Sequence, residues 1–334
     1  MLGFRKNKLI PAFLSFDVEP DGFQLPRSAP PPWPGYGAMF EIAEKLRSRL
    51  FERSGVVPKF GWYFRTDPQI AEVYGGANSA LVEFPDRIAT FRAHGDYFGV
   101  HCHPIRWCQD RRQWVHDIGD AWIAKCTRSA LDAFAEWQGS PALRFRAGGG
   151  YLSNTMVDII DEGGVKVDLS LEPVKGWWLY SSDVQTAIDS SPIIGKYTDC
   201  DTAPRVAYRP AREDFRIRGS ESGRRLIMIP HTTAAKPEAS FWRKVVQRLH
   251  HRPSGDAMML YPSVEWPSAA FFWDTVARQI QSMHKPYLSL GFRTDAPGSL
   301  LVTRVRQILD ALPQHGLAER LRFVDPIDVA PRLV

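Results

Sequence analysis

The stretch FLSFDVEPDG, residues 13–22, decides how the rest of the chain is interpreted. Its first four residues, FLSF, are mostly apolar and are typical of a short buried strand. Asp17, Glu19 and Asp21 follow at alternate positions, and Pro20 and Gly22 break the regular structure among them. Carboxylates at this spacing need a compensating cation if they are buried, so the stretch predicts either a metal site or a solvated turn.

Composition limits the classes of protein to which the chain can belong. Its 334 residues are 44% hydrophobic and 24% charged, as in an ordinary globular protein of one large domain or two. The formal net charge is only +5 and both signs are interspersed, which argues against a nucleic-acid binder and leaves an anionic substrate open.

The cysteines and the N-terminus bear on the compartment. The four cysteines form no CxxC pair, so reduced thiols in a cytoplasmic protein are expected instead of a disulfide framework. The N-terminal apolar run is short and contains Pro11, which favours a first strand over a signal peptide. No stretch reaches the roughly 20 apolar residues of a transmembrane segment.

Hydrophobic periodicity along the chain predicts strands that alternate with helices. Residues 24–37 contain too much proline for a helix and predict a loop that either covers the carboxylates or lies on the surface. The alternation predicts a parallel sheet, open or closed, with chemical groups at the carboxyl ends of its strands. The predicted strands are 13–16, 58–64, 96–100, 165–170, 226–230, 257–261, 286–292 and 322–324, and the predicted helices are 38–54, 86–94, 117–137, 156–162, 241–250, 271–283 and 300–312.

A second chemical stretch follows the strand predicted at residues 96–100. His101 and His103 come at alternate positions directly after it, where their imidazoles can converge with carboxylates from the first strand. The other interpretation is one structural histidine and one exposed histidine. A metal site is favoured because the two carboxylates at 17 and 19 and the two histidines at 101 and 103 both follow predicted strands, where they can meet.

Other residues with chemical potential also stand at strand ends or in loops. Arg146, Asp168 and His231 each follow or end an apolar run. The glycines at 148–150 allow close backbone approach to a ligand, or form a plain loop. Trp177 and Trp178 suit stacking on sugar rings, although core packing is the commoner use of tryptophan.

In order, the motifs SFDVEPDG, GVHCHP, FRAGGGY and GGVKVDLS resemble the first four motifs of the polysaccharide deacetylase family, the NodB-homology family or carbohydrate esterase family 4. The later stretches YRPAREDF and LIMIP resemble branches associated with exopolysaccharide clusters. The resemblance implies one domain over residues 1–334, a distorted (β/α)7 barrel with a loop-rich excursion at about residues 172–225. It also implies metal-dependent removal of acetyl groups from amino sugars.

The resemblance implies a role for each matched residue of the first two motifs. Asp17 corresponds to the general base, and Glu19 to the acidic metal ligand. His101 and His103 would complete the metal triad, with zinc as the expected ion. Such a site polarises an acyl carbonyl and lowers the pKa of bound water from ~15.7 toward ~7.

The later motifs supply supporting roles by the same resemblance. Arg146 would orient the base through a bidentate pair. The backbone of Tyr151 would help to hold the oxyanion, and Asp168 would belong to a supporting motif.

The chain departs from the family pattern at three positions. Ile105 stands where the second histidine of the HxxxH spacing is expected, and Glu19 replaces the usual aspartate. Arg293 stands where a histidine normally protonates the departing amine. Arginine cannot donate a proton at neutral pH, so Arg293 is assigned to substrate binding with Trp177 and Trp178, and His231 becomes the candidate acid.

The sequence therefore predicts a metal-dependent hydrolase, acting on C–N bonds other than peptide bonds, that deacetylates a sugar or oligosaccharide. One alternative is a catalytically degenerate member of the family that binds carbohydrate. Another is a hydrolase of a non-sugar amide, as in allantoinase-like relatives. No nucleic-acid partner is expected.

Overall fold

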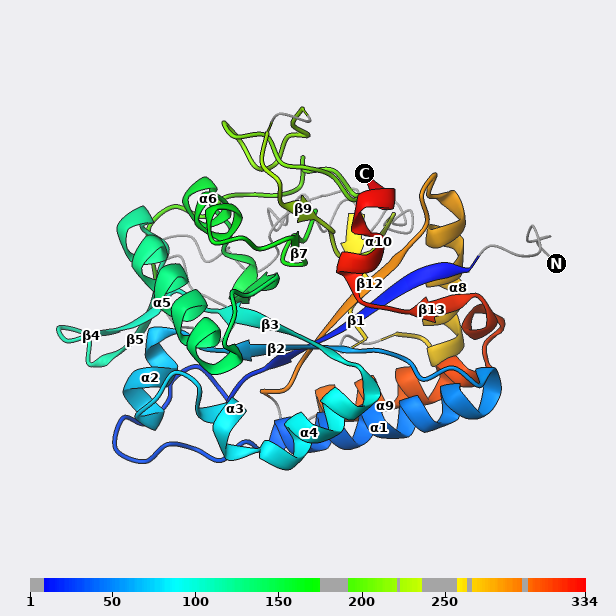
Figure 1. The fold of residues 1–334 in the computed structure, drawn as a ribbon, viewed down its shortest axis with the longest axis horizontal. Coiled ribbons are helices and arrows are strands. Elements are labelled where there is room, and N and C mark those ends of the chain that lie inside the picture. The colour runs from blue at the N-terminus through cyan, green and yellow to red at the C-terminus, as the bar shows by residue number, and fades with distance from the viewer. Residues whose placement is uncertain (1–8, 175–191, 221–222, 236–256, 263–265, 296–299) are drawn as a thin grey trace, which may run out of the picture.

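The computed structural model describes residues 9–174, 192–220, 223–235, 257–262, 266–295 and 300–334. Its central sheet is entirely parallel and curls into an open barrel (Figure 1). The strand order is β12-β1-β2-β3-β6-β7-β9, and β13 pairs with β1 beside this path. The strands are β1 (Ile10–Val18), β2 (Gly61–Arg65), β3 (Tyr97–Cys102), β6 (Arg144–Ala147), β7 (Val167–Asp168), β9 (Ile227–Met228), β12 (Leu288–Arg293) and β13 (Leu321–Phe323).

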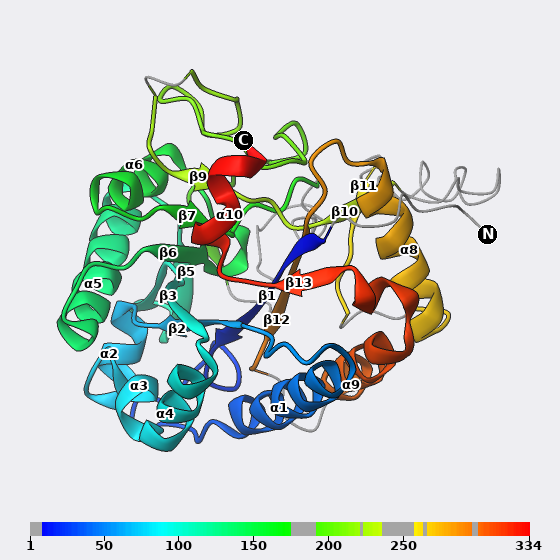
Figure 2. The ribbon, with the colours of Figure 1, turned by 45° about the vertical axis from the view of Figure 1, so that its right-hand side comes forward.

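Helices cover the outside of this curled sheet (Figure 2). They pack on the outward side chains of the strands, such as Leu14 and Phe16 of β1, which belong to the main hydrophobic core. None of the helices in the described ranges is long and apolar enough to cross a membrane. The helices are α1 (Pro34–Ser54), α2 (Pro68–Tyr74), α3 (Ser79–Glu83), α4 (Pro85–His94), α5 (Asp120–Gln138), α6 (Asn154–Glu162), α8 (Ala269–Ser282), α9 (Leu300–Ala311) and α10 (Pro326–Leu333).

A second, smaller core fills the inside of the curled sheet. Phe13 of β1, Tyr63 of β2 and Ile227 of β9 point inward and pack against Leu333 of α10. Because side chains alternate across a strand, Asp17 faces the same side as Phe13, four residues further along β1. The helix α10 therefore plugs one end of the barrel interior, and the carboxyl ends of the strands carry the polar groups at the other.

The gap between the two ends of the sheet is bridged by backbone and side-chain hydrogen bonds. Thr232 N donates to Ser289 O at 2.9 Å, and Ser289 N donates to Thr232 Oγ1 at 2.9 Å. The hydroxyl of Tyr287 donates to Pro230 O at 3.2 Å. These bonds join the segment after β9 to β12, and the predicted distorted (β/α)7 barrel of the NodB type is confirmed.

Two small sheets lie outside the barrel. The hairpin β4 (Ile105–Cys108) and β5 (Gln113–Asp117) directly follows His103 and pairs with β8 (Ile193–Ile194). The strands β10 (Thr233–Ala235) and β11 (Ala257–Met259) pair with each other. The strand predicted at residues 257–261 is present as β11, which is antiparallel to β10 and does not join the barrel.

The proline-rich loop predicted for residues 24–37 is too long by four residues. Helix α1 begins at Pro34, and Pro34 occupies its first turn. Proline fits that position because the first amides of a helix have no intrahelical acceptor. The predicted helix at residues 241–250 lies outside the described residues.

A buried ion pair fastens α1 to the start of the sheet. The guanidinium of Arg47 in α1 donates to both carboxylate oxygens of Asp96, at 3.0 and 2.6 Å. The same carboxylate accepts from Phe60 N and from Trp62 Nε1, each at 2.8 Å. Because the side chain of Asp96 is fully buried, it links α1, β2 and the entry to β3 without competition from water.

We expect Asp96→Ala to lower the free energy of unfolding by about 3 to 5 kcal/mol, because it removes the buried carboxylate that binds Arg47 and leaves only the partly exposed Glu44 as its ion-pair partner. Urea denaturation measures this loss. Glu52→Ala, on the exposed side of the same helix, is the control and should change stability by at most about 0.5 kcal/mol. Equal stability of the two variants would contradict the structural role of the pair.

Candidate metal centre

The acidic end of β1 is held in place by β12. Thr294 N donates to Asp17 O at 3.1 Å. Glu19 N donates to Thr294 Oγ1 at 2.8 Å, and the same hydroxyl donates to Glu19 O at 3.0 Å. These bonds fix the backbone on which both carboxylates stand, so Asp17 and Glu19 point into the site from a rigid strand end.

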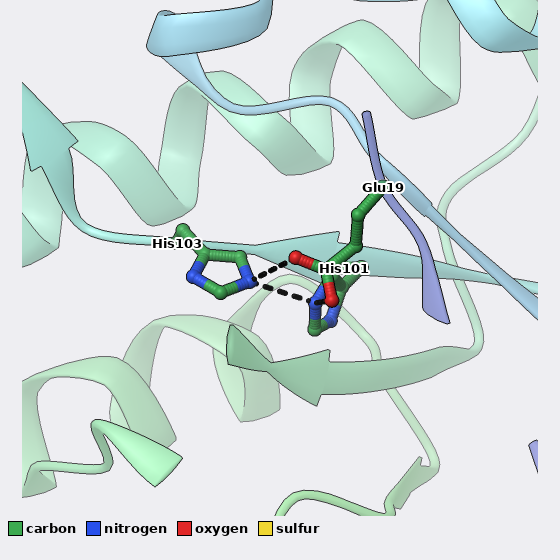
Figure 3. Close-up of side chains that lie close together, drawn as sticks. All are labelled: Glu19, His101 and His103. Carbon is green, nitrogen blue, oxygen red and sulfur yellow. Dashed lines mark hydrogen bonds and ion pairs between the residues drawn. The ribbon is translucent and has the colours of Figure 1, made fainter. Parts of the chain in front are cut away.

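Glu19, His101 and His103 converge at the carboxyl ends of β1 and β3 (Figure 3). Their ligand atoms all lie within 4.8 Å of one another, and the three side chains are buried. His101 Nε2 lies 3.0 Å from His103 Nε2, which lies 2.9 Å from Glu19 Oε2. His101 Nε2 and Glu19 Oε1 are 3.7 Å apart.

The imidazole nitrogens of this cluster have the protonation state that ligands require. His101 Nδ1 lies 3.0 Å from Arg146 O, and donation to this carbonyl leaves the lone pair on Nε2, toward Glu19 and His103. Burial lowers the pKa of His103 to about 3, so its imidazole is neutral. His103 therefore presents a neutral nitrogen donor, and Nε2 of His101 points toward the same place.

The carboxylate of Glu19 is ionised in this setting. Burial alone would raise its pKa, but His103 and the positive charge of Arg293 beside it hold the pKa of Glu19 well below its usual range. Arg293 Nε lies 3.4 Å from Glu19 Oε1.

This donor set fits a divalent ion of the zinc type. Two neutral imidazoles and one carboxylate make a catalytic zinc set with open positions. Zinc–nitrogen distances of about 2.0–2.1 Å in a tetrahedron separate ligand atoms by roughly 3.3 Å, close to the separations observed here. The distance of 3.0 Å between the two Nε2 atoms brings two lone pairs together unless one nitrogen is protonated, which a shared cation resolves.

Asp67, which sequence reasoning missed, fixes the backbone at His103. His103 N donates to Asp67 Oδ2 at 3.1 Å. Arg65 binds both oxygens of Asp67, at 2.7 and 2.8 Å, and also Gln69 Oε1 at 2.7 Å. These contacts let a histidine two residues after His101 complete the cluster, whereas Ile105 begins strand β4. The charged residues directly after the apolar strand GWYF were the available signal.

The glycine run at 148–150, which was predicted to allow a ligand close to the backbone, instead allows the side chain of His103 to lie close to it. A Cβ atom on Gly148 would lie 2.1 to 2.4 Å from three atoms of the His103 ring. The ring of Phe23 lies on His103 with centroids 5.0 Å apart. Together they confine the imidazole of His103 to one orientation.

Asp17 forms a bidentate ion pair beside the cluster. Arg146 Nε donates to Asp17 Oδ1 at 2.5 Å and Nη2 donates to Oδ2 at 2.9 Å. Asp17 Oδ1 lies 3.8 Å from His101 Nδ1. The pair places the Asp17 carboxylate beside the ring of His101, on its Nδ1 side, and the role of Asp17 as a base stays a prediction.

His231 supports Arg146 and is poorly suited to act as an acid. Its Nε2 lies 2.7 Å from Arg146 Nη1, which also donates to Leu169 O at 2.5 Å. Burial and the charge of Arg146 hold the pKa of His231 well below its usual range. A neutral imidazole whose Nε2 accepts from arginine has no proton on that atom to give, so the geometry favours a positioning role.

Asp168 and Tyr151 are near the site but do not touch the cluster. Asp168 accepts from the hydroxyl of Ser170, which in turn accepts from Ala147 N at 2.6 Å, and burial raises the pKa of Asp168 to about 7. Tyr151 N donates to Gly148 O at 3.3 Å, so its amide is engaged within the chain. The oxyanion role of Tyr151 stays a prediction.

Arg293 lies at the mouth of the site, as expected for a residue that contacts substrate. Its side chain is 43% exposed and lies 4.8 Å above the ring of Phe23, beside Asp295. Trp177 and Trp178 lie outside the described residues. Asp21, the third carboxylate of the opening stretch, is not in the cluster, and burial raises its pKa to about 6.

Comparison with solved structures places the fold. A protein of Parabacteroides distasonis provisionally described as a glycoside hydrolase/deacetylase has a TM-score of 0.51 at 9% identity, with 97% of this chain and 71% of that chain covered. PuuE allantoinase has a TM-score of 0.50 at 10% identity, with 98% and 91% covered. The chain has the NodB-type deacetylase fold.

Other comparisons add little to this placement. A polysaccharide deacetylase of Mycobacterium smegmatis, also provisionally described, has a TM-score of 0.49 at 10% identity and covers 99% of this chain and 92% of its own. Neither a family sequence profile nor a curated protein sequence matches the chain. The NodB-type fold is therefore established by structure.

We expect Gly148→Ala to weaken zinc binding by at least tenfold, because the new methyl group would push the His103 ring out of the cluster. Isothermal titration calorimetry of the metal-stripped protein measures the affinity. Gly76→Ala is the matched control, because the nearest atom to its added Cβ would be 3.9 Å away. Unchanged affinity in the Gly148 variant would contradict the confinement of His103.

Proposed function

We propose that the protein is a metal-dependent hydrolase that removes an acetyl group from an acetylated amino sugar or saccharide. The observation that carries the proposal is the convergence of Glu19, His101 and His103 beside the Asp17–Arg146 pair. It is supported by the NodB-type fold and by the descriptions of similar structures as deacetylases and carbohydrate esterases.

In the proposed hydrolysis, three residues would bind the metal ion and a fourth would accept a proton from water. Glu19, His101 and His103 would hold the divalent ion, most simply zinc. When bound, such an ion polarises an acyl carbonyl and lowers the pKa of water from ~15.7 toward ~7. Asp17 would take the proton of the attacking water, since each of its oxygens keeps one lone pair beyond its bond to Arg146.

Arg146 makes Asp17 suitable as a base. The ion pair with Asp17 raises the pKa of Arg146 despite burial, so its positive charge is permanent. Its two parallel bonds prevent rotation of the Asp17 carboxylate and hold it toward the cluster. Positioning of this kind converts a collision into a preorganised step.

Two other functions remain candidates on specific observations. A catalytically degenerate carbohydrate-binding protein is favoured by Arg293, which stands where an acid is expected and faces the mouth of the site. Hydrolysis of a non-sugar amide is suggested by the likeness to PuuE allantoinase. A binder would tolerate loss of the metal, whereas both hydrolases would not.

We expect Asp17→Asn to lose at least 10²-fold in turnover and to keep its bound metal, because Asp17 transfers a proton and is not a ligand. His101→Ala should lose the metal itself. Metal content by mass spectrometry and acetate release from a panel of acetylated sugars measure the two effects. Metal loss in the Asp17 variant would make Asp17 a ligand, and full activity of metal-free wild type would disprove the proposed function.

A further inference from the structure

The reaction proposed above lacks an assigned proton donor for the departing amine. Arg293 stands at the usual position but stays charged, because the neighbouring Asp295 and Glu19 raise its pKa further. His231 Nε2 is occupied by Arg146. An amide C–N bond does not break readily unless the nitrogen is protonated, so a donor is required if the substrate is an amide.

Glu172 occupies the loop that follows β7, on the same side of the barrel as the cluster. The carbonyl of the preceding residue, Leu171, accepts from His231 N at 2.9 Å. Three residues before Glu172, the carbonyl of Leu169 accepts from Arg146 Nη1 at 2.5 Å, so the loop that carries Glu172 begins at the catalytic pair. Unlike the fully buried Asp168, Glu172 is partly exposed and can reach a bound substrate.

Tyr261 fixes the side chain of Glu172 from the opposite wall. The Tyr261 hydroxyl donates to Glu172 Oε1, and the Tyr261 ring lies 6.1 Å from the ring of His231. Only one carboxyl oxygen is used in this bond. The second oxygen of Glu172 makes no hydrogen bond recorded within the described ranges.

We propose that Glu172 is the general acid of the hydrolysis, in place of the histidine that the family pattern would put at Arg293; this inference rests on the proposed function. After water has added to the acyl carbon, the C–N bond breaks and its electron pair stays on nitrogen. That nitrogen takes the proton from the Glu172 carboxyl group as the C=O bond re-forms. The products are the free amine and acetic acid, which ionises to acetate in solution. Asp17 then releases to solvent the proton that it took from the attacking water, and Glu172, left as a carboxylate, regains a proton from solvent.

The environment of Glu172 favours the protonated form of its carboxyl group more than water does. Burial raises the pKa of Glu172, and the hydrogen bond from Tyr261 partly opposes this shift. A raised carboxyl pKa near the working pH is the usual property of a glutamate that donates a proton. The titratable and charged groups that act on Glu172 or feel its charge are Asp17, Arg146, Arg293, Tyr261, Tyr197 and Cys200.

The test compares two substrates that differ in their need for an acid. Acetyl release from N-acetylglucosamine oligomers requires protonation of nitrogen, whereas 4-nitrophenolate leaves 4-nitrophenyl acetate without it. We expect Glu172→Gln in the zinc-loaded protein to lose at least 10²-fold in kcat on the oligomers and less than about threefold on the ester. Glu162→Gln, an exposed glutamate at the end of α6, is the control and should match wild type on both.

Two further variants separate an acid from a structural residue. His231→Gln should slow both substrates alike, because His231 acts through Arg146 and hence on the attack of water. Tyr261→Phe should move the high-pH limb of amide hydrolysis to higher pH, because the lost hydroxyl bond stabilised the carboxylate. An unmoved limb in this variant would overturn the assignment.

The possible results are distinguishable from failure of the proposed function. Equal losses on both substrates in Glu172→Gln would overturn the acid role while leaving a metal-dependent hydrolase. Hydrolysis of the ester by wild type with no release from the oligomers would also overturn it, because no amide reaction would need a donor. Hydrolysis of neither substrate by zinc-loaded wild type would overturn both.

Discussion

The ion pair between Arg146 and Asp17 is the interaction on which the rest of the site depends. Arg146 joins four parts of the barrel. Its guanidinium binds Asp17 of β1, His231 after β9 and the carbonyl of Leu169, and its backbone carbonyl accepts from His101. Breaking one of these contacts would leave a buried charge or donor unpaired, at a cost of several kcal/mol. The arrangement therefore has essentially one stable geometry.

Each carboxylate of the site has a guanidinium partner. Asp17 pairs with Arg146, and both Glu19 and Asp295 pair with Arg293, while His103 is neutral. Arg146 neutralises the charge of Asp17, and the partly exposed Arg293 is the cation beside Glu19. A bound divalent ion would take over this second role, and Arg293 would then be free to meet a substrate at the mouth.

Much of the site followed from the sequence, because parallel strands bring their carboxyl ends together whatever the loops do. Asp17, Glu19 and His101 stand at the ends of apolar runs, and their meeting required only the correct strand order. Asp67 could not be found in this way, because its function is a side-chain bond to a backbone amide 36 residues away. Local patterns carry no information on such contacts.

The missed elements have a similar explanation. The hairpin after His103 includes Trp114, and the indole Nε1 of Trp114 donates to Leu25 O of the proline-rich loop at 2.7 Å. That loop and the hairpin stabilise each other, so neither has a strong pattern of its own. The same mutual support explains how the chain dispenses with a histidine at Ile105: His103 is held by Asp67 behind and by Phe23 and Gly148 at its faces.

The exchange of histidine for arginine at position 293 changes what the rest of the site must supply. An imidazolium at that strand end would bring both a proton and a positive charge, whereas Arg293 brings only the charge. The charge of Arg293 holds Glu19 ionised, so in the proposed hydrolysis the proton would come from another group. Among the described residues near Asp17 and Arg146, Glu172 combines a raised pKa with partial exposure. The positive charge and the proton donor then belong to different residues with different neighbours. Asp295 pairs with Arg293, and Tyr261 donates a hydrogen bond to Glu172.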